Sequence, residues 1–178
     1  MKTFLYTPYE LALIIRFYNM DIVTSVEFLE KIFKYDNAFI ETKYRHVQKK
    51  FMLAVMDMLN YLSNQEQFEL ETTAINQDMN DFGLKNNIQN NSSSALNVHN
   101  MIFKEMRLKI QYINKNGYTK MKLRTLLNKL GYKKRSTMII DYILDCLLFY
   151  HISVSLKSNV KCDIEQVNLD RLLTFRII

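Results

Sequence analysis

The stretch GYTKMKLRTLLNKLGYKKRSTMIIDYILDCLLFYHISVSLKSNVKCDIE, residues 117–165, passes from helical to alternating spacing of its apolar residues. Leucines at helical spacing predict a helix over 120–130, which Thr119 caps and Gly131 ends. YKKRS then forms a tight turn, and Ser136 caps a third helix over 137–150. HISVSL (151–156) and VKCDIEQV (160–167) alternate on either side of the turn residues KSN, which predicts a β-hairpin.

Charge is divided unequally along the chain, whose net charge is +6. Residues 1–100 hold 9 Lys and Arg against 12 Asp and Glu, whereas residues 101–178 hold 15 against 6. Between Lys104 and Arg135 there are eleven cations and one acid, Glu105. A surface of this kind attracts polyanions over a long range. Nucleic acid is the commonest such partner, followed by anionic lipid or an acidic protein.

A further helix is expected over 100–117, ending at Gly117. Its cations should be mostly turned outward: Lys104, Arg107, Lys109 and Lys115. Its inward side is formed by Ile102, Met106, Ile110 and Ile113.

The order helix, helix, tight turn, helix, hairpin over about residues 100–167 resembles a winged-helix domain, the helix-turn-helix variant with a β-wing. The resemblance rests on TKMKLRTLLNKLGYKKRSTMIIDYILDCL, with Gly131 where the motif turns. It implies a third helix that enters the DNA major groove and a wing that touches the neighbouring backbone.

This resemblance gives the cations a role on DNA. Lys133, Lys134 and Arg135 precede the third helix, where they and the helix N-terminus would face phosphate. The start of the second helix and the hairpin turn supply the remaining cations. The expected DNA-binding residues are Lys120, Lys122, Arg124, Lys133, Lys134, Arg135, Ser136, Thr137, Tyr142, Lys157 and Lys161.

The third helix itself gives little support for base recognition. Its outer face offers Thr137, Met138, Asp141, Tyr142 and Asp145, and the two aspartates would repel phosphate. The helix has no Arg for the bidentate contact with guanine. We therefore expect mainly backbone binding, with a preference for AT-rich or easily deformed DNA. The other face should be buried core, with Cys146 as a small core residue; its members are Ile139, Ile140, Ile143, Leu144, Leu147 and Leu148.

The N-terminal half is expected to form a helical domain over 1–83, followed by a flexible Asn- and Ser-rich linker over 84–99 and the basic domain over 100–178. Helices are predicted over 8–20, with Thr7 as cap and Pro8 in the first turn, over 24–35, and over 39–62. Thr24 and Glu27 form a capping-box pattern for the second of these.

The N-terminal half also invites comparison with the basic domain. An offset of 97 aligns residues 25–35 with 122–132, and QFELETTAI (67–75) could be a wing, so a second, acidic winged helix is one interpretation. Tandem winged helices are similar in plan to the initiators of some plasmids and phages, in which one domain pairs with a partner copy. Otherwise this half is a helical oligomerisation or effector domain. Either way we expect it to mediate a homodimer.

Catalytic motifs are absent from the sequence. There is no glycine-rich phosphate loop, GxSxG or HExxH, and the two cysteines form no CxxC. Glu69 and Glu71 are a weak candidate for a metal-dependent nuclease. We expect no enzyme, no metal and no cofactor. No apolar run is long enough to span a bilayer, and the N-terminal stretch indicates a helix of the fold rather than a signal peptide, so the cytoplasm is the expected compartment.

The sequence thus predicts a mainly α (α+β) protein whose C-terminal winged helix binds double-stranded DNA, in transcriptional regulation or replication initiation. The alternative is a protein-interaction or assembly factor that uses its basic face on an acidic partner. A plainer interpretation is that the lysines only solvate one face of a basic domain.

Overall fold

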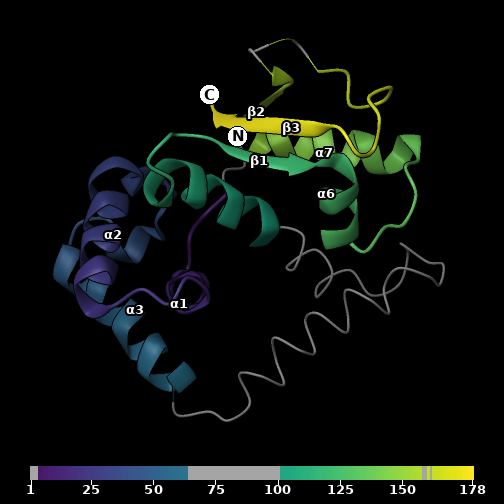
Figure 1. The fold of residues 1–178 in the computed structure, drawn as a ribbon. Helices are drawn as coiled ribbons and strands as arrows, with labels where there is room; N and C mark the ends of the chain where they lie inside the picture. Colours follow the sequence, from purple (N-terminus) through teal and green to yellow (C-terminus); the bar gives the residue numbers. More distant parts are fainter. Residues whose placement is uncertain (1–3, 64–100, 158–159, 161) are drawn as a thin grey trace. The chain divides into compact units, whose positions relative to one another are not determined.

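The computed structural model describes residues 4–63, 101–157, 160 and 162–178. These residues belong to two compact units, which we call the N-terminal unit (4–63) and the C-terminal unit (from 101 onward) (Figure 1). The fold is mainly α-helical with a small three-stranded antiparallel sheet. The expected linker over 84–99 and the candidate wing over 67–75 lie outside the described residues.

The N-terminal unit begins with helix α1 (Pro8–Phe17). The Thr7 hydroxyl accepts a hydrogen bond from the Glu10 amide at 3.2 Å, and the Glu10 carboxylate accepts one from the Thr7 amide at 2.9 Å. This reciprocal capping box satisfies two amides that have no partner inside the helix. The predicted cap at Thr7 and the proline in the first turn are confirmed.

Helix α2 (Ile22–Tyr35) begins earlier than the sequence pattern predicted. The Asp21 carboxylate, and not Thr24, is the N-cap: it accepts a hydrogen bond from the Thr24 amide at 2.7 Å. The predicted capping box of Thr24 with Glu27 is therefore wrong. Aspartate caps a helix as well as threonine does, and its position three residues earlier satisfies the first-turn amides.

Helix α3 (Gln48–Ser63) covers only the later part of the helix predicted over 39–62. The chain before it forms two short 3-10 turns, η1 (Asn37–Phe39) and η2 (Thr42–Tyr44). The side-chain amide of Asn37 donates to the Arg45 carbonyl at 2.9 Å, and the Arg45 guanidinium donates to the Ile40 carbonyl at 2.6 Å. Side chains thus take the carbonyls that a continuous helix would have used.

The offset-97 repeat aligns residues 25–35, which lie in α2, with residues 122–132, which include α6 (Leu123–Lys129). Similar helices alone do not establish a repeat, and the candidate wing lies outside the described residues, so the repeat stays a prediction.

The C-terminal unit opens with an α-helix over 101–108 that continues as a π-helical segment, η3 (Lys109–Ile113). Strand β1 (Thr119–Lys122) and helices α6 (Leu123–Lys129) and α7 (Thr137–Phe149) follow. Strands β2 (Ile152–Ser155) and β3 (Leu172–Ile177) complete the unit. The strand order is β1-β3-β2, with both pairings antiparallel, and α7 lies behind the sheet in the view of Figure 1.

The predicted helix over 120–130 is wrong in its first turn, because residues 119–122 form strand β1. Thr119 pairs with Phe175 and Met121 with Leu173 across the ladder to β3. Thr119 is buried and Met121 half-buried, whereas Lys120 and Lys122, which alternate with them, are exposed. A strand of alternating polar and apolar residues needs a partner, and the partner here is more than fifty residues away in the sequence.

The prediction of which residues form the second strand of the hairpin is also wrong. Residues 160–167 were expected to return against 151–156, but Leu172–Ile177 does so. Val160 is 57% exposed, and the Asp163 carboxylate accepts from the Glu165 amide at 2.9 Å, which makes a local turn. Leu173 and Phe175, in contrast, are fully buried in the central strand.

The turn between α6 and α7 agrees with the prediction. Gly131 has φ +81°, and the amides of Gly131 and Tyr132 donate to the carbonyls of Asn128 and Leu127, at 3.0 and 2.8 Å. This is the pattern of a Schellman motif, which favours glycine because its φ is positive. The Ser136 hydroxyl caps α7 by accepting from the Ile139 amide at 3.4 Å.

One face of α7 is buried, but the face is narrower than predicted. Ile139, Ile140, Ile143, Cys146 and Leu147 are buried as expected. The expectation that Leu144 and Leu148 are buried is wrong, since they are 40% and 72% exposed. Three short strands and the preceding helix offer α7 a single layer to pack against, so its remaining apolar side chains stay outside.

Phe175→Ala should lower the free energy of unfolding by about 3–5 kcal/mol, because it removes a fully buried ring from the central strand. Val160→Ala, on an exposed side chain, should change it by less than about 0.5 kcal/mol. Urea denaturation followed by circular dichroism measures both. A large loss for Val160→Ala with little loss for Phe175→Ala would restore the hairpin predicted over 160–167.

Candidate nucleic-acid interface

The α6–α7 turn presents two of its three predicted cations to solvent. Lys133 and Lys134 are exposed. Arg135 is exposed too, but its guanidinium donates to the backbone carbonyls of Val167 at 2.6 Å and Ile164 at 3.3 Å. Arg135 therefore fastens the β2–β3 connection to the turn, which leaves the two lysines as the turn's free cations.

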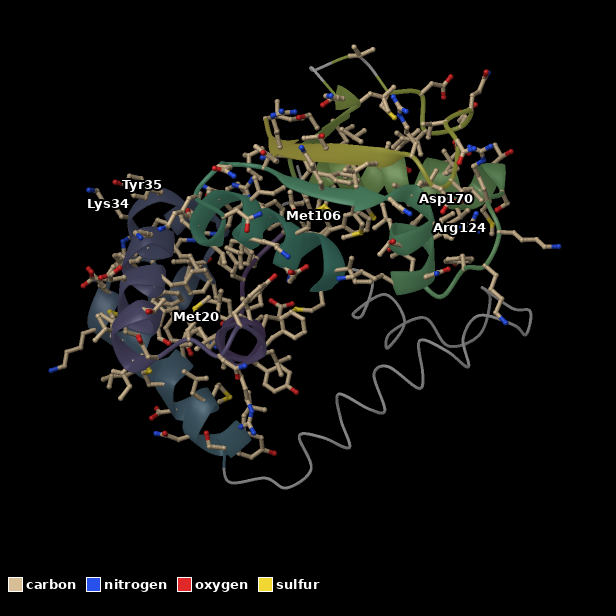
Figure 2. All side chains as sticks on the ribbon, viewed as in Figure 1. Met20, Lys34, Tyr35, Met106, Arg124 and Asp170 are labelled. Atoms are coloured by element: carbon tan, nitrogen blue, oxygen red, sulfur yellow. The ribbon has the colours of Figure 1, made fainter. Side chains whose placement is uncertain are left out.

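Arg124 has a similar internal role. Its guanidinium binds both carboxylate oxygens of Asp170, at 2.7 and 2.9 Å (Figure 2). The Arg124 amide also donates to the Leu169 carbonyl at 2.9 Å. The hydrogen bonds from Arg124 hold the pKa of Asp170 below its usual range, and Asp170 raises the pKa of Arg124. Because the two charges cancel each other, Arg124 adds little net charge to the surface.

Lys120 and Lys122 were expected on a helix and lie instead on strand β1, where both are exposed. They belong to the face of the sheet that points away from the core, here called the outer sheet face. Lys122 lies close enough to Asp170 to lower the pKa of that carboxyl. The outer sheet face comprises Tyr118, Lys120, Lys122, Ser153, Ser155, Leu172, Thr174 and Arg176.

Arg176 and Tyr118 are two charged or aromatic residues of this face that the sequence did not indicate as site residues. The Tyr118 ring lies beside both neighbouring cations, 5.2 Å from the Lys120 ammonium and 5.5 Å from the Arg176 guanidinium. No local spacing could have revealed this group, because the pairing of β1 with β3 brings its members together.

The outer face of α7 differs from the expectation at Tyr142. Its hydroxyl is buried, and burial, with a smaller contribution from a hydrogen bond to Cys146, raises its pKa well above the usual range. Tyr142 is therefore a packed side chain and offers no hydroxyl to a ligand. Thr137 is exposed as expected, in company with Met138, Asp141, Leu144, Asp145 and Leu148.

Two cations that were expected on the surface of the helix over 101–108 are buried. Lys104 is 8% exposed and Arg107 is 3% exposed, and the Arg107 guanidinium donates to the Tyr150 carbonyl at 3.4 Å. Lys157, at the hairpin, is exposed, and Lys161 lies outside the described residues. The exposed cations of the described residues therefore lie mainly at the α6–α7 turn and on the outer sheet face. The helix over 101–108 contributes fewer of them than the sequence predicted.

The described residues give no support for a metal site or a membrane-spanning helix. No three His, Cys, Asp or Glu side chains there lie together in a way that could hold a metal ion. Within the same ranges, no helix is both long and apolar enough to cross a bilayer. Comparison with protein-family models, with curated proteins and with solved structures found no match to the chain.

The Arg124–Asp170 pair should make stability depend on pH. A carboxyl whose pKa is lowered by folding stabilises the fold above the ordinary pKa of aspartate, about 3.9, and loses that contribution as pH falls through the lowered pKa. Asp170→Asn should therefore be less stable than the wild type at neutral pH and equal to it in acid. Urea denaturation of both proteins, at neutral pH and at a pH below the lowered pKa of Asp170, measures the difference in stability.

Asp145→Asn, which removes an exposed carboxylate on α7, is the matched control. Its effect on stability should not follow the pH profile of Asp170→Asn. An Asp170→Asn variant that is as stable as the wild type at neutral pH would show that the ion pair does not stabilise the β2–β3 connection.

Proposed function

We propose that the C-terminal unit is a winged helix that binds double-stranded DNA. Its element order supports this: a helix, a strand, two helices joined by a tight turn, and two further strands. The last strand pairs with the first strand as well as with its hairpin partner, and this is a plan consistent with a winged helix. Strands β2 and β3, which pair as a hairpin, would form the wing.

The observation that carries the proposal is the pair of exposed lysines, Lys133 and Lys134, directly before the capped N-terminus of α7. The sequence from 106 to 140 contains no Asp or Glu, so no acid within this segment neutralises them. The amides of the first turn of α7 add partial positive charge at the same place. Phosphate is the group that this combination favours.

Binding of this kind would use the DNA backbone more than the bases. Asp141 and Asp145 on the outer face of α7 would be repelled by phosphate if the helix lay deep in a groove. Contact through the turn and the first turn of α7 avoids that repulsion. Sequence preference would then come from DNA shape, for which AT-rich duplexes are the first choice. Transcriptional regulation and replication initiation are the settings that such binding fits.

Lys133→Gln combined with Lys134→Gln should weaken binding to an AT-rich duplex at every salt concentration. Loss of two phosphate contacts should reduce the slope of log K against log salt by about 1.8. Fluorescence anisotropy of a labelled duplex over a salt series measures both quantities, and circular dichroism checks the fold.

Lys49→Gln combined with Lys50→Gln is the control for this experiment, because it removes the same charge from exposed positions at the start of α3. The control should bind DNA as the wild type does. Equal binding by the turn variant and the wild type would remove the α6–α7 turn from the interface. A wild type that does not bind the duplex would reject the proposed function.

A protein partner is the second candidate, and the outer face of α7 favours it. Met138 and Leu148 are 55% and 72% exposed beside the two aspartates. Apolar side chains gathered on one helix face are typical of protein contacts. An acidic protein on the basic surface is the related alternative; such a surface would bind DNA weakly, without the steep salt dependence of phosphate contacts.

The N-terminal unit is the proposed site of self-association. Phe17, Ile22 and Val23 lie within seven positions at the α1–α2 corner and are 65–79% exposed. Apolar exposure of this extent supports a contact with a second copy, and closed dimers are the commonest oligomers.

Ile22→Glu combined with Val23→Glu should convert a dimer to a monomer, measured by sedimentation velocity. Both positions lie in the first turn of α2, where glutamate interacts favourably with the helix dipole, so the fold should be retained. Leu148→Glu on α7 is the matched control and should leave the dimer intact. If Leu148→Glu dissociated the dimer and the α2 variant did not, the dimer contact would lie on α7 and not at the α1–α2 corner.

A further inference from the structure

The outer sheet face carries a group of polar side chains that the proposed duplex contact at the α6–α7 turn does not use. The strand register sets Lys120, Thr174 and Ser155 in one row across the three strands. Ser153 and Arg176 form the neighbouring pair. Lys120 and Ser153 are exposed, Ser155 and Arg176 are half-buried, and Thr174 in the central strand is buried, at 4% exposure. One side of a small sheet thus presents two cations and two hydroxyls.

Tyr118 organises this group. Its ring lies 5.2 Å from the Lys120 ammonium and 5.5 Å from the Arg176 guanidinium. The Arg176 guanidinium also donates to the Ser155 hydroxyl at 3.0 Å. Attraction between a cation and the face of a ring restrains a long side chain that would otherwise be mobile. Two like charges are therefore held near each other before any ligand arrives.

The charge of this group is not balanced by acids on the same face. Strands β1, β2 and β3 contain no Asp or Glu. Lys122 helps to lower the pKa of the Asp170 carboxyl, and both oxygens of that carboxyl bind Arg124. Two restrained cations on strands that carry no acid favour an anionic ligand.

We propose that the outer sheet face binds the sugar-phosphate backbone of a single-stranded nucleic acid. Lys120 and Arg176 would bind phosphates, and the Tyr118 ring and the serine hydroxyls would contact bases and sugars. A duplex fits less well, because reading its major groove requires a protruding helix or ribbon, whereas this face is a sheet surface. The inference does not depend on duplex binding at the α6–α7 turn, since the residues differ.

Lys120→Gln combined with Arg176→Gln is the test, with a fluorescein-labelled oligo(dT) strand and an AT-rich duplex as probes in fluorescence anisotropy. The variant should lose at least about tenfold in affinity for the single strand, and its salt slope should fall by about 1.4. Affinity for the duplex should fall by clearly less than affinity for the single strand, since the turn lysines are intact.

Lys133→Gln combined with Lys134→Gln removes the same charge from the same unit and is the matched control. It should retain binding to oligo(dT) and lose binding to the duplex. Wild-type affinity of the Lys120→Gln, Arg176→Gln variant for oligo(dT) would overturn the inference. Equal losses by both variants on both probes would also overturn it, because that result requires only overall charge.

Two further measurements keep the test independent of damage to the sheet. Tyr118→Leu should lose roughly tenfold in affinity for oligo(dT), and Tyr118→Phe, which keeps the ring, should bind as the wild type does. In the wild type, oligo(dT) should shift the amide NMR signals of β1 and β3 more than those of α7. Shifts confined to α7 and the α6–α7 turn would overturn the inference.

Discussion

The arrangement of the C-terminal unit depends on the pairing of β3 with two strands at once. Leu173 and Phe175 are fully buried in this central strand, so the sheet forms only when the last described segment of the chain returns to it. Burial of these side chains offsets the entropy of closing a connection of sixteen residues between β2 and β3. The positions of the surface cations follow from this pairing.

Two arginines fasten the long connection to the helices. Arg124 binds Asp170 at the start of α6, and Arg135 binds two carbonyls beside the α6–α7 turn. A planar guanidinium with several donors suits such contacts better than a lysine ammonium does. The arginines and lysines of the basic segment therefore differ in role. These two arginines hold the fold together, and the lysines beside them remain available to an anionic partner.

The unit accordingly presents surfaces of different character. The α6–α7 turn and the outer sheet face are basic, whereas the outer face of α7 combines exposed apolar side chains with two aspartates. Phosphate is attracted to the first two and repelled by the third. Under the binding modes that we propose, the turn and the sheet would hold a polyanion while α7 stays available for a protein contact.

Features that depend on neighbours along the chain were predictable from the sequence. Thr7 and Ser136 cap helices, Gly131 ends α6 with a positive φ, and one face of α7 is buried, because these are local choices of hydrogen bonding and spacing. The pairing of the strands followed from contacts between distant segments. The sequence predicted residues 119–122 as the cap and first turn of a helix, and their pairing with residues 172–175 makes them a strand. The same contacts between distant segments decided that Arg124 and Arg135 are internal, that Tyr142 is packed, and that Tyr118 gathers Lys120 and Arg176. Their energies depend on distances in space that no local pattern of residues records.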